Sequence, residues 1–243
     1  MITFQGRQKA IRTADIIQRK AHSLYPHISS SKLEVRYNNS LHFSNPSYKL
    51  TPDLCQNVID RLRDMRIILR EGNNYLTKII SELQDKKVGN CFEDAMLSLL
   101  IGKLNGQKNT YIGSIIFQDK KDKTKIYIDH VVSFVTRKKI KFKNIYTFKN
   151  KDAVIIDPWL NIVDFADNYF TRIMNNYMDM FKGSPEKDFK ELKKKSSKQF
   201  SFCIDSNVVA ELDKKDIEYF KALYPELVIK KYKKITFPRK KKS

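Results

Sequence analysis

The segment at residues 88–104, VGNCFEDAMLSLLIGKL, leads from a tight turn into an apolar helical run. Gly89 permits a sharp turn without a side chain that blocks the approach, and Cys91 follows where the helix is expected to begin. The free N–H groups and the dipole at a helix N-terminus favour a thiolate, and they can later face the negative oxygen of a tetrahedral intermediate. The sequence therefore predicts an activated thiol at Cys91, on a helix that stops near Gly106.

Two polar residues downstream complete the order cysteine, histidine, aspartate. His130 is the one polar residue on the apolar face of the alternating, strand-like segment 125–134. A buried imidazole needs a hydrogen-bond partner. Asp157, which closes the apolar run 153–157, would supply a carboxylate to the ring nitrogen that does not face the thiol. A thiol nucleophile, its general base and a group that orients the base form such a set. We expect Cys91, His130 and Asp157 to be the catalytic residues.

Each of these residues also has a structural interpretation. A cysteine at a helix start is usually a small buried residue, a histidine on an apolar strand is usually hydrogen bonded in the core, and aspartate before proline often opens a turn. Their conjunction, in this order, favours the catalytic interpretation. Cys55 and Cys203 lie in apolar segments and are expected to be packing residues. Trp159 is expected to anchor the core beside Asp157 or to line the cleft.

The composition indicates a folded, non-membrane protein. The chain has 243 residues, of which 41% are apolar and 12% aromatic. It has no apolar stretch near the ~20 residues that a membrane span needs, and no signal peptide is expected at its start. Three widely spaced cysteines are expected in a reducing compartment and provide no disulfide framework. No cysteine or histidine pair has zinc-ligand spacing, so neither a metal nor a cofactor is expected.

The positive charge is concentrated near the C-terminus. The formal net charge is +20, and residues 229–243 carry eight lysines and arginines and no acid. A second lysine cluster at residues 187–198 is partly offset by acids. Such charge favours association with nucleic acid, with acidic lipid headgroups or with an acidic protein. The alternative is a solvated, disordered tail that keeps the protein soluble.

The pattern along the chain predicts an α+β architecture, with helices first, then an antiparallel sheet, then helices. A mainly helical N-terminal region is expected at 1–85, a catalytic core at 86–225 and a basic tail at 226–243. Helices are predicted at 7–24, 51–69, 75–83, 91–104, 163–181 and 213–223. Strands are predicted at 33–43 (a short pair), 110–118, 125–136, 141–148, 153–157 and 199–204.

Three segments carry a family resemblance: Gly89-Asn90-Cys91-Phe92-Glu93, residues 129–135 (DHVVSFV) and residues 155–159 (IIDPW). They resemble the Cys-His-Asp core of the papain-like and transglutaminase-like superfamily. There a helix that begins with the cysteine packs on an antiparallel sheet, which carries the histidine and the aspartate. The resemblance covers residues 88–159 and is closest to bacterial effectors that deamidate or cross-link glutamines.

The resemblance implies roles for the residues that match it. Cys91 would be the nucleophile, His130 the general base and then the acid, and Asp157 the residue that orients His130. The 39 residues from Cys91 to His130 favour the compact transglutaminase-like core, and the 27 residues to Asp157 imply an extra strand or loop at 138–151. Asn90 and Gln84 are the candidate oxyanion donors, because the glutamine that papain-like proteases place six residues before the cysteine is Asp85 here.

The leading functional hypothesis is cysteine-dependent acyl transfer on a protein amide, as a glutamine deamidase or transglutaminase that forms a thioester. The substrate would be a glutamine-containing protein, for example a host protein. One alternative is a papain-like cysteine protease or deubiquitinase-like hydrolase with the same triad. A second is a binding module whose basic tail engages nucleic acid or an anionic membrane. By analogy, the protein would be a secreted effector in the host cytosol, or cytoplasmic.

Overall fold

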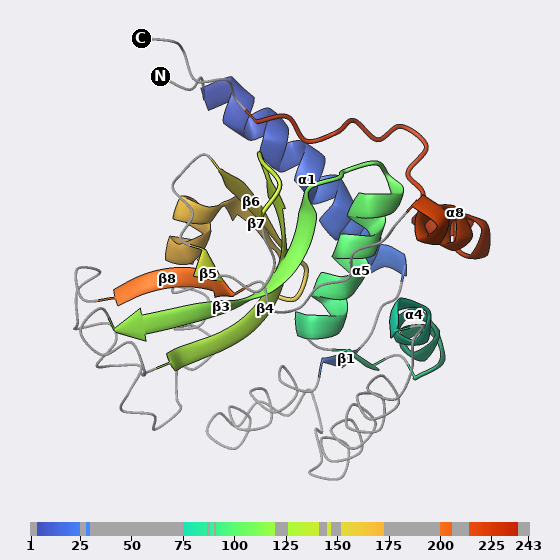
Figure 1. The fold of residues 1–243 in the computed structure, drawn as a ribbon, viewed down its shortest axis with the longest axis horizontal. Coiled ribbons are helices and arrows are strands. Elements are labelled where there is room, and N and C mark those ends of the chain that lie inside the picture. Colours follow the sequence, from blue (N-terminus) through green and yellow to red (C-terminus); the bar gives the residue numbers. More distant parts are fainter. Residues whose placement is uncertain are drawn as a thin grey trace, which may run out of the picture.

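The computed structural model describes residues 4–24, 28–29, 75–86, 88–89, 91–119, 126–140, 145–146, 152–172, 200–205 and 214–237. The strand pair predicted at 33–43 and the helix predicted at 51–69 lie outside these residues. Within them the fold is mixed α+β, as the sequence pattern predicts (Figure 1). No helix in these ranges is long and apolar enough to cross a membrane.

A six-stranded antiparallel sheet forms the centre of the fold, with the strand order β5-β8-β3-β4-β6-β7. The central strands β3 and β4 pair along most of their length, from Thr110 opposite Val135 to Gln118 opposite Ile126. Their sequences are rich in the β-branched and aromatic residues that are typical of strands. The strands are β3 (Thr110–Asp119), β4 (Ile126–Thr136), β5 (Ile145–Tyr146), β6 (Ala153–Asp157), β7 (Ile162–Phe165) and β8 (Phe200–Asp205).

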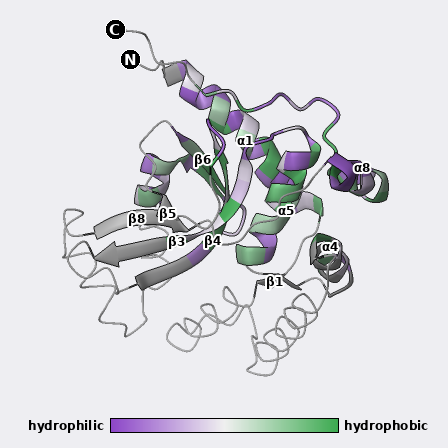
Figure 2. Cartoon of the chain, viewed as in Figure 1, coloured by the Kyte–Doolittle hydropathy of each residue, from purple (hydrophilic) through white to green (hydrophobic). Residues whose placement is uncertain are grey.

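The helices pack around this sheet. They are α1 (Phe4–Leu24), α4 (Tyr75–Lys86), α5 (Cys91–Leu104), α8 (Lys214–Leu223) and the 3-10 helix η1 (Pro225–Leu227). Helix α5 contacts α1, α4 and α8 as well as β3, β4 and β6. It is therefore buried on nearly all sides, and Figure 2 shows it as mostly hydrophobic, whereas α1 carries hydrophilic residues on its outer side.

Residues from all three predicted parts of the chain share one hydrophobic core. Helix α1 contributes a stripe at spacings of four and three residues, Ala10, Ala14, Ile17 and Ala21, which is fully buried. Three of these four side chains are methyl groups, so α1 approaches α5 and strands β6 and β7 closely. From the C-terminal end, Leu227 and Ile235 enter the same core.

Helix α5 ends as its sequence predicts. Gly106 has a φ of 79°, the left-handed conformation that favours glycine. Its N–H donates to the Lys103 carbonyl at 2.9 Å, and the Gln107 N–H donates to the Gly102 carbonyl at 2.9 Å. These two bonds form a Schellman motif, which satisfies carbonyls that the helix end leaves free.

Two local predictions are wrong. Residues 163–165, predicted as helix, belong to β7, and helical residues begin at Ala166. Asn161, with a φ of 57°, closes a turn with Pro158 that sends the chain back along β6, and all four residues of β7 are buried. Val88 and Gly89, predicted as part of a tight turn, form a short parallel strand β2 that pairs with β1 (Ile28–Ser29).

Candidate active site

Cys91 is the first residue of α5, as the sequence predicts. Its thiol is free and partly exposed. The next residues of the first turn, Glu93 and Asp94, are buried acids at the positive end of the helix dipole. The thiol therefore lies at the end of a rigid, buried helix, which fixes its position relative to the sheet.

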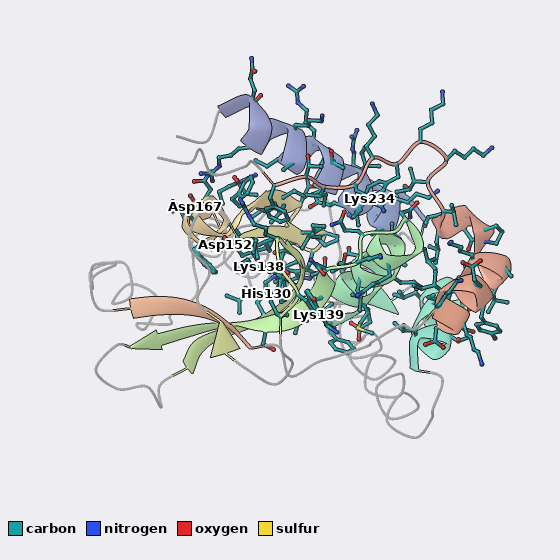
Figure 3. The ribbon with its side chains drawn as sticks, turned by 45° about the horizontal axis from the view of Figure 1, so that its top comes forward. His130, Lys138, Lys139, Asp152, Asp167 and Lys234 are labelled. Carbon is teal, nitrogen blue, oxygen red and sulfur yellow. The ribbon has the colours of Figure 1, made fainter. Side chains whose placement is uncertain are left out.

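His130 lies on β4 at the point where a neighbouring strand ends. The pairing of β4 with β6 runs from Thr136 to Ser133, so His130 lies three residues beyond the last paired position. The chain that leaves β6 instead forms the turn at residues 158–161 beside it. His130 is only 1% exposed and lies in the interior of the molecule (Figure 3). Residues of the turn after β6 therefore meet the imidazole, as the ring contact of Trp159 with His130 shows.

The structure brings together the three predicted catalytic residues. The His130 Nε2 atom lies 2.8 Å from Asp157 Oδ2, and both side chains are 1% exposed. A side-chain hydrogen bond links His130 to Cys91 as well. Because Nε2 faces the carboxylate, Nδ1 is the ring nitrogen that remains for the thiol. The imidazole therefore lies between the sulfur and the carboxylate, in the order that a nucleophile, base and orienting residue require.

The charge of Asp157 controls the protonation of His130. Burial by itself lowers the pKa of His130, but the charge and hydrogen bond of Asp157, with further contributions from Cys91, raise it from 6.5 to about 10. An imidazole with this pKa is protonated at neutral pH. His130 therefore places a positive charge beside the thiol of Cys91.

Three donors hold the Asp157 carboxylate in place. In addition to His130, the Tyr169 hydroxyl donates to Oδ2 at 2.7 Å, and the Leu160 N–H donates to Oδ1 at 3.1 Å. Tyr169 is fully buried in the helical residues 166–172 that follow β7. A carboxylate with several donors keeps one orientation, which in turn fixes the ring of His130.

Trp159 contributes a wall to this site. It follows Asp157 in the turn after β6 and is 5% exposed. Its ring centroid lies 5.1 Å from that of His130, with a tilt of 49° between the planes. The indole covers one side of the imidazole and excludes water from it, which strengthens the interaction between His130 and Asp157. This position fits the expected role of Trp159 as a core anchor beside Asp157, and its role as a cleft wall stays a prediction.

The predicted oxyanion donors are not placed at the site by the structure. Asn90 lies outside the described residues, and Gln84 is an exposed residue on α4. A contribution from either side chain stays a prediction. Within the described parts of the chain, no group of three or more His, Cys, Asp and Glu side chains is arranged to hold a metal ion.

Sequence reasoning missed Tyr169. The residue falls in a segment, Asn168-Tyr169-Phe170, that carries no motif, and its link to Asp157 depends on the turn between β6 and β7. A usable signal was the phenol itself, because a buried tyrosine hydroxyl generally has a hydrogen-bond partner.

Comparisons of this chain with protein families, with curated proteins and with solved structures find no match.

Proposed function

We propose that this protein is a cysteine-dependent acyl transferase that acts on the side-chain amide of a protein glutamine. The observation that carries the proposal is the position of His130, between the carboxylate of Asp157 at 2.8 Å and the thiol of Cys91. A buried imidazolium of this kind activates a thiolate and holds a proton for a leaving group. The likeness to the papain-like and transglutaminase-like core rests on this arrangement and on the segments around Cys91, His130 and Asp157.

The reaction would proceed through a thioester. The Cys91 thiolate attacks the γ-carbonyl carbon of glutamine, and the C–N bond breaks as His130 gives its proton to the departing ammonia. Water or a lysine amine then attacks the thioester, transfers a proton to His130 and releases the thiolate. Water yields glutamate (deamidation), and an amine yields a cross-link (transglutamination). The N–H groups at the start of α5 would stabilise the oxyanion in both steps.

Thiol reactivity is the first test. The rate of iodoacetamide alkylation, measured at each cysteine by peptide mass spectrometry between pH 5 and pH 9, separates an activated thiolate from a packing residue. We expect rapid labelling of Cys91 at neutral pH, and loss of that labelling in His130→Ala. Cys55 and Cys203 in the same digest are the internal controls.

Activity is tested on glutamine itself. An N-blocked Gln-Gly dipeptide serves as acyl donor, with water or a dansylated primary amine as acceptor, and ammonia release is recorded. We expect Cys91→Ala to abolish release and Cys203→Ala to preserve it. If Cys91→Ala releases ammonia at the wild-type rate, the proposal is wrong.

A cysteine protease or deubiquitinase-like hydrolase would use the same three residues, so substrate fate distinguishes it. Intact mass spectrometry of a protein substrate shows either an unbroken chain with an amide converted to acid, or fragments. By analogy with bacterial effectors, the substrate is proposed to be a host protein and the site of action the host cytosol.

A further inference from the structure

The C-terminal residues 227–237 lie along the surface and are attached to the body at both ends. Near Leu227, the Asn105 side chain donates to the Leu227 carbonyl at 3.1 Å and accepts from the Ile229 N–H at 2.7 Å. At the far end, the Ile235 N–H donates to the Gln107 side chain at 2.9 Å. Both anchoring side chains belong to the loop after α5, so the segment is held in place and is not a free tail.

Between these anchors the sequence repeats every three residues. Residues 229–235 are Ile-Lys-Lys-Tyr-Lys-Lys-Ile, and Ile229, Tyr232 and Ile235 pack against the core. We call the four lysines between them the lysine strip; all four are exposed: Lys230, Lys231, Lys233 and Lys234. The inward packing of every third side chain leaves the four lysines exposed, and the Lys234 side chain extends over Gly106 in the loop after α5.

Among the residues that the structure describes, none of the four lysines has an ion pair with a carboxylate. The segment runs beside α1 (Figure 1), and its last residue, Phe237, meets the Phe165 ring on which Arg7 of α1 also lies. Helix α1 adds two further exposed cations, Lys9 and Arg12. The sequence continues with Arg-Lys-Lys-Lys at 239–242.

We infer that the lysine strip docks the protein onto an anionic lipid surface. Single-stranded nucleic acid would need exposed aromatic rings on which bases stack, but the aromatic residues of the segment, Tyr232 and Phe237, pack inward. The cations of the strip are all lysines, which attract anionic headgroups as point charges. The neighbouring helix α8 supplies an exposed apolar pair, Tyr219 at 52% and Leu223 at 45% exposure, one turn apart. Binding to a membrane surface increases with the apolar area that is buried and with attraction to anionic lipids, and the apolar pair and the lysines supply one of these each.

The test is co-sedimentation of the full chain with lipid vesicles. Zwitterionic vesicles are compared with vesicles that contain about 30% phosphatidylserine, a strongly anionic composition. Each lysine near such a surface is worth roughly fivefold in binding, so replacement of all four by glutamine should weaken binding by more than about 100-fold. Replacement of the same four by arginine keeps the charge and should preserve binding. Binding of the wild type should also fall steeply from about 0.1 M to about 0.5 M salt.

Two further measurements separate the lipid surface from other partners. Tyr219→Ser with Leu223→Ser should weaken binding to anionic vesicles by about tenfold, because apolar contact is lost while charge is kept. Binding to a fluorescent DNA duplex is measured in parallel at the same salt. Equal vesicle binding by wild type and the four-glutamine variant overturns the inference. Tighter binding to the duplex than to anionic vesicles also overturns it, in favour of a nucleic-acid surface.

Discussion

The Tyr169 hydroxyl donates to the Asp157 Oδ2 atom at 2.7 Å, the same oxygen that lies 2.8 Å from His130. Tyr169 thus acts on the proposed base through the carboxylate and is a positioning residue. Its ring, buried after β7, ties the helical residues 166–172 to the end of β6. The geometry of the site therefore depends on a residue outside the predicted set of Cys91, His130 and Asp157.

Replacement of Tyr169 by phenylalanine tests this relationship. The variant keeps the ring but loses the donor, so we expect the free energy of unfolding to fall by about 1–3 kcal/mol, the range for a buried hydrogen bond to a charged group. Alkylation of Cys91 should slow severalfold because the carboxylate is less well oriented. Urea unfolding and iodoacetamide kinetics measure both effects. Tyr219→Phe, at an exposed tyrosine, is the matched control and should change neither.

Asp157→Asn removes the charge that raises the pKa of His130 while it preserves the shape of the side chain. Burial then dominates and lowers the pKa of His130, so the imidazole is neutral at pH 7. We expect alkylation of Cys91 at pH 6 to 7 to slow by at least about 100-fold, as for orienting carboxylates of other triads. Asp167→Asn breaks only the ion pair of that residue with Arg7 and should leave the rate unchanged. Equal rates in the two variants would contradict the role of Asp157.

The raised pKa of His130 predicts how stability depends on pH. The pKa is raised from 6.5 to about 10 in the folded protein, so the folded state binds the proton more tightly than the unfolded state. The resulting stabilisation is complete below about pH 6.5 and is lost as the pH rises through about 10. We expect the difference in unfolding free energy between wild type and His130→Asn to shrink across this window. A difference that stays constant from pH 6 to pH 10 would refute the prediction.

The burial of α1 predicts that the N-terminal helix and the sheet with α5 unfold together. Ile17 is fully buried in the core that α1 shares with α5. Ile17→Ala should lower the free energy of unfolding by about 2–5 kcal/mol, with a single transition in urea. Gln8→Ala, at an exposed position of the same helix, should change it by less than about 0.5 kcal/mol. A separate early transition in Ile17→Ala would show that α1 unfolds independently.

Local sequence was sufficient for the elements that carry the triad. Neighbouring residues determine turn geometry, backbone conformation and the period of the side chains. These local properties are enough to predict that α5 starts at Cys91, that it stops at Gly106 and that a strand alternates around His130. The order of Cys91, His130 and Asp157 was therefore enough to predict that they meet. An extra strand predicted after β4 is present as β5, at Ile145–Tyr146.

Only the tertiary structure decided what surrounds the triad. Residues 163–165 have apolar positions that suit a helix as well as a strand, and pairing with β6 selects the strand. Three contacts depend on how separate segments of the chain pack together. They are the hydrogen bond from Tyr169 to Asp157, the ring contact of Trp159 with His130, and the packing of Ile229, Tyr232 and Ile235 on the core. Sequence by itself determined the local elements and suggested the proposed chemistry, because both depend on nearby residues. The partners of each side chain depend on long-range packing, which no local pattern encodes.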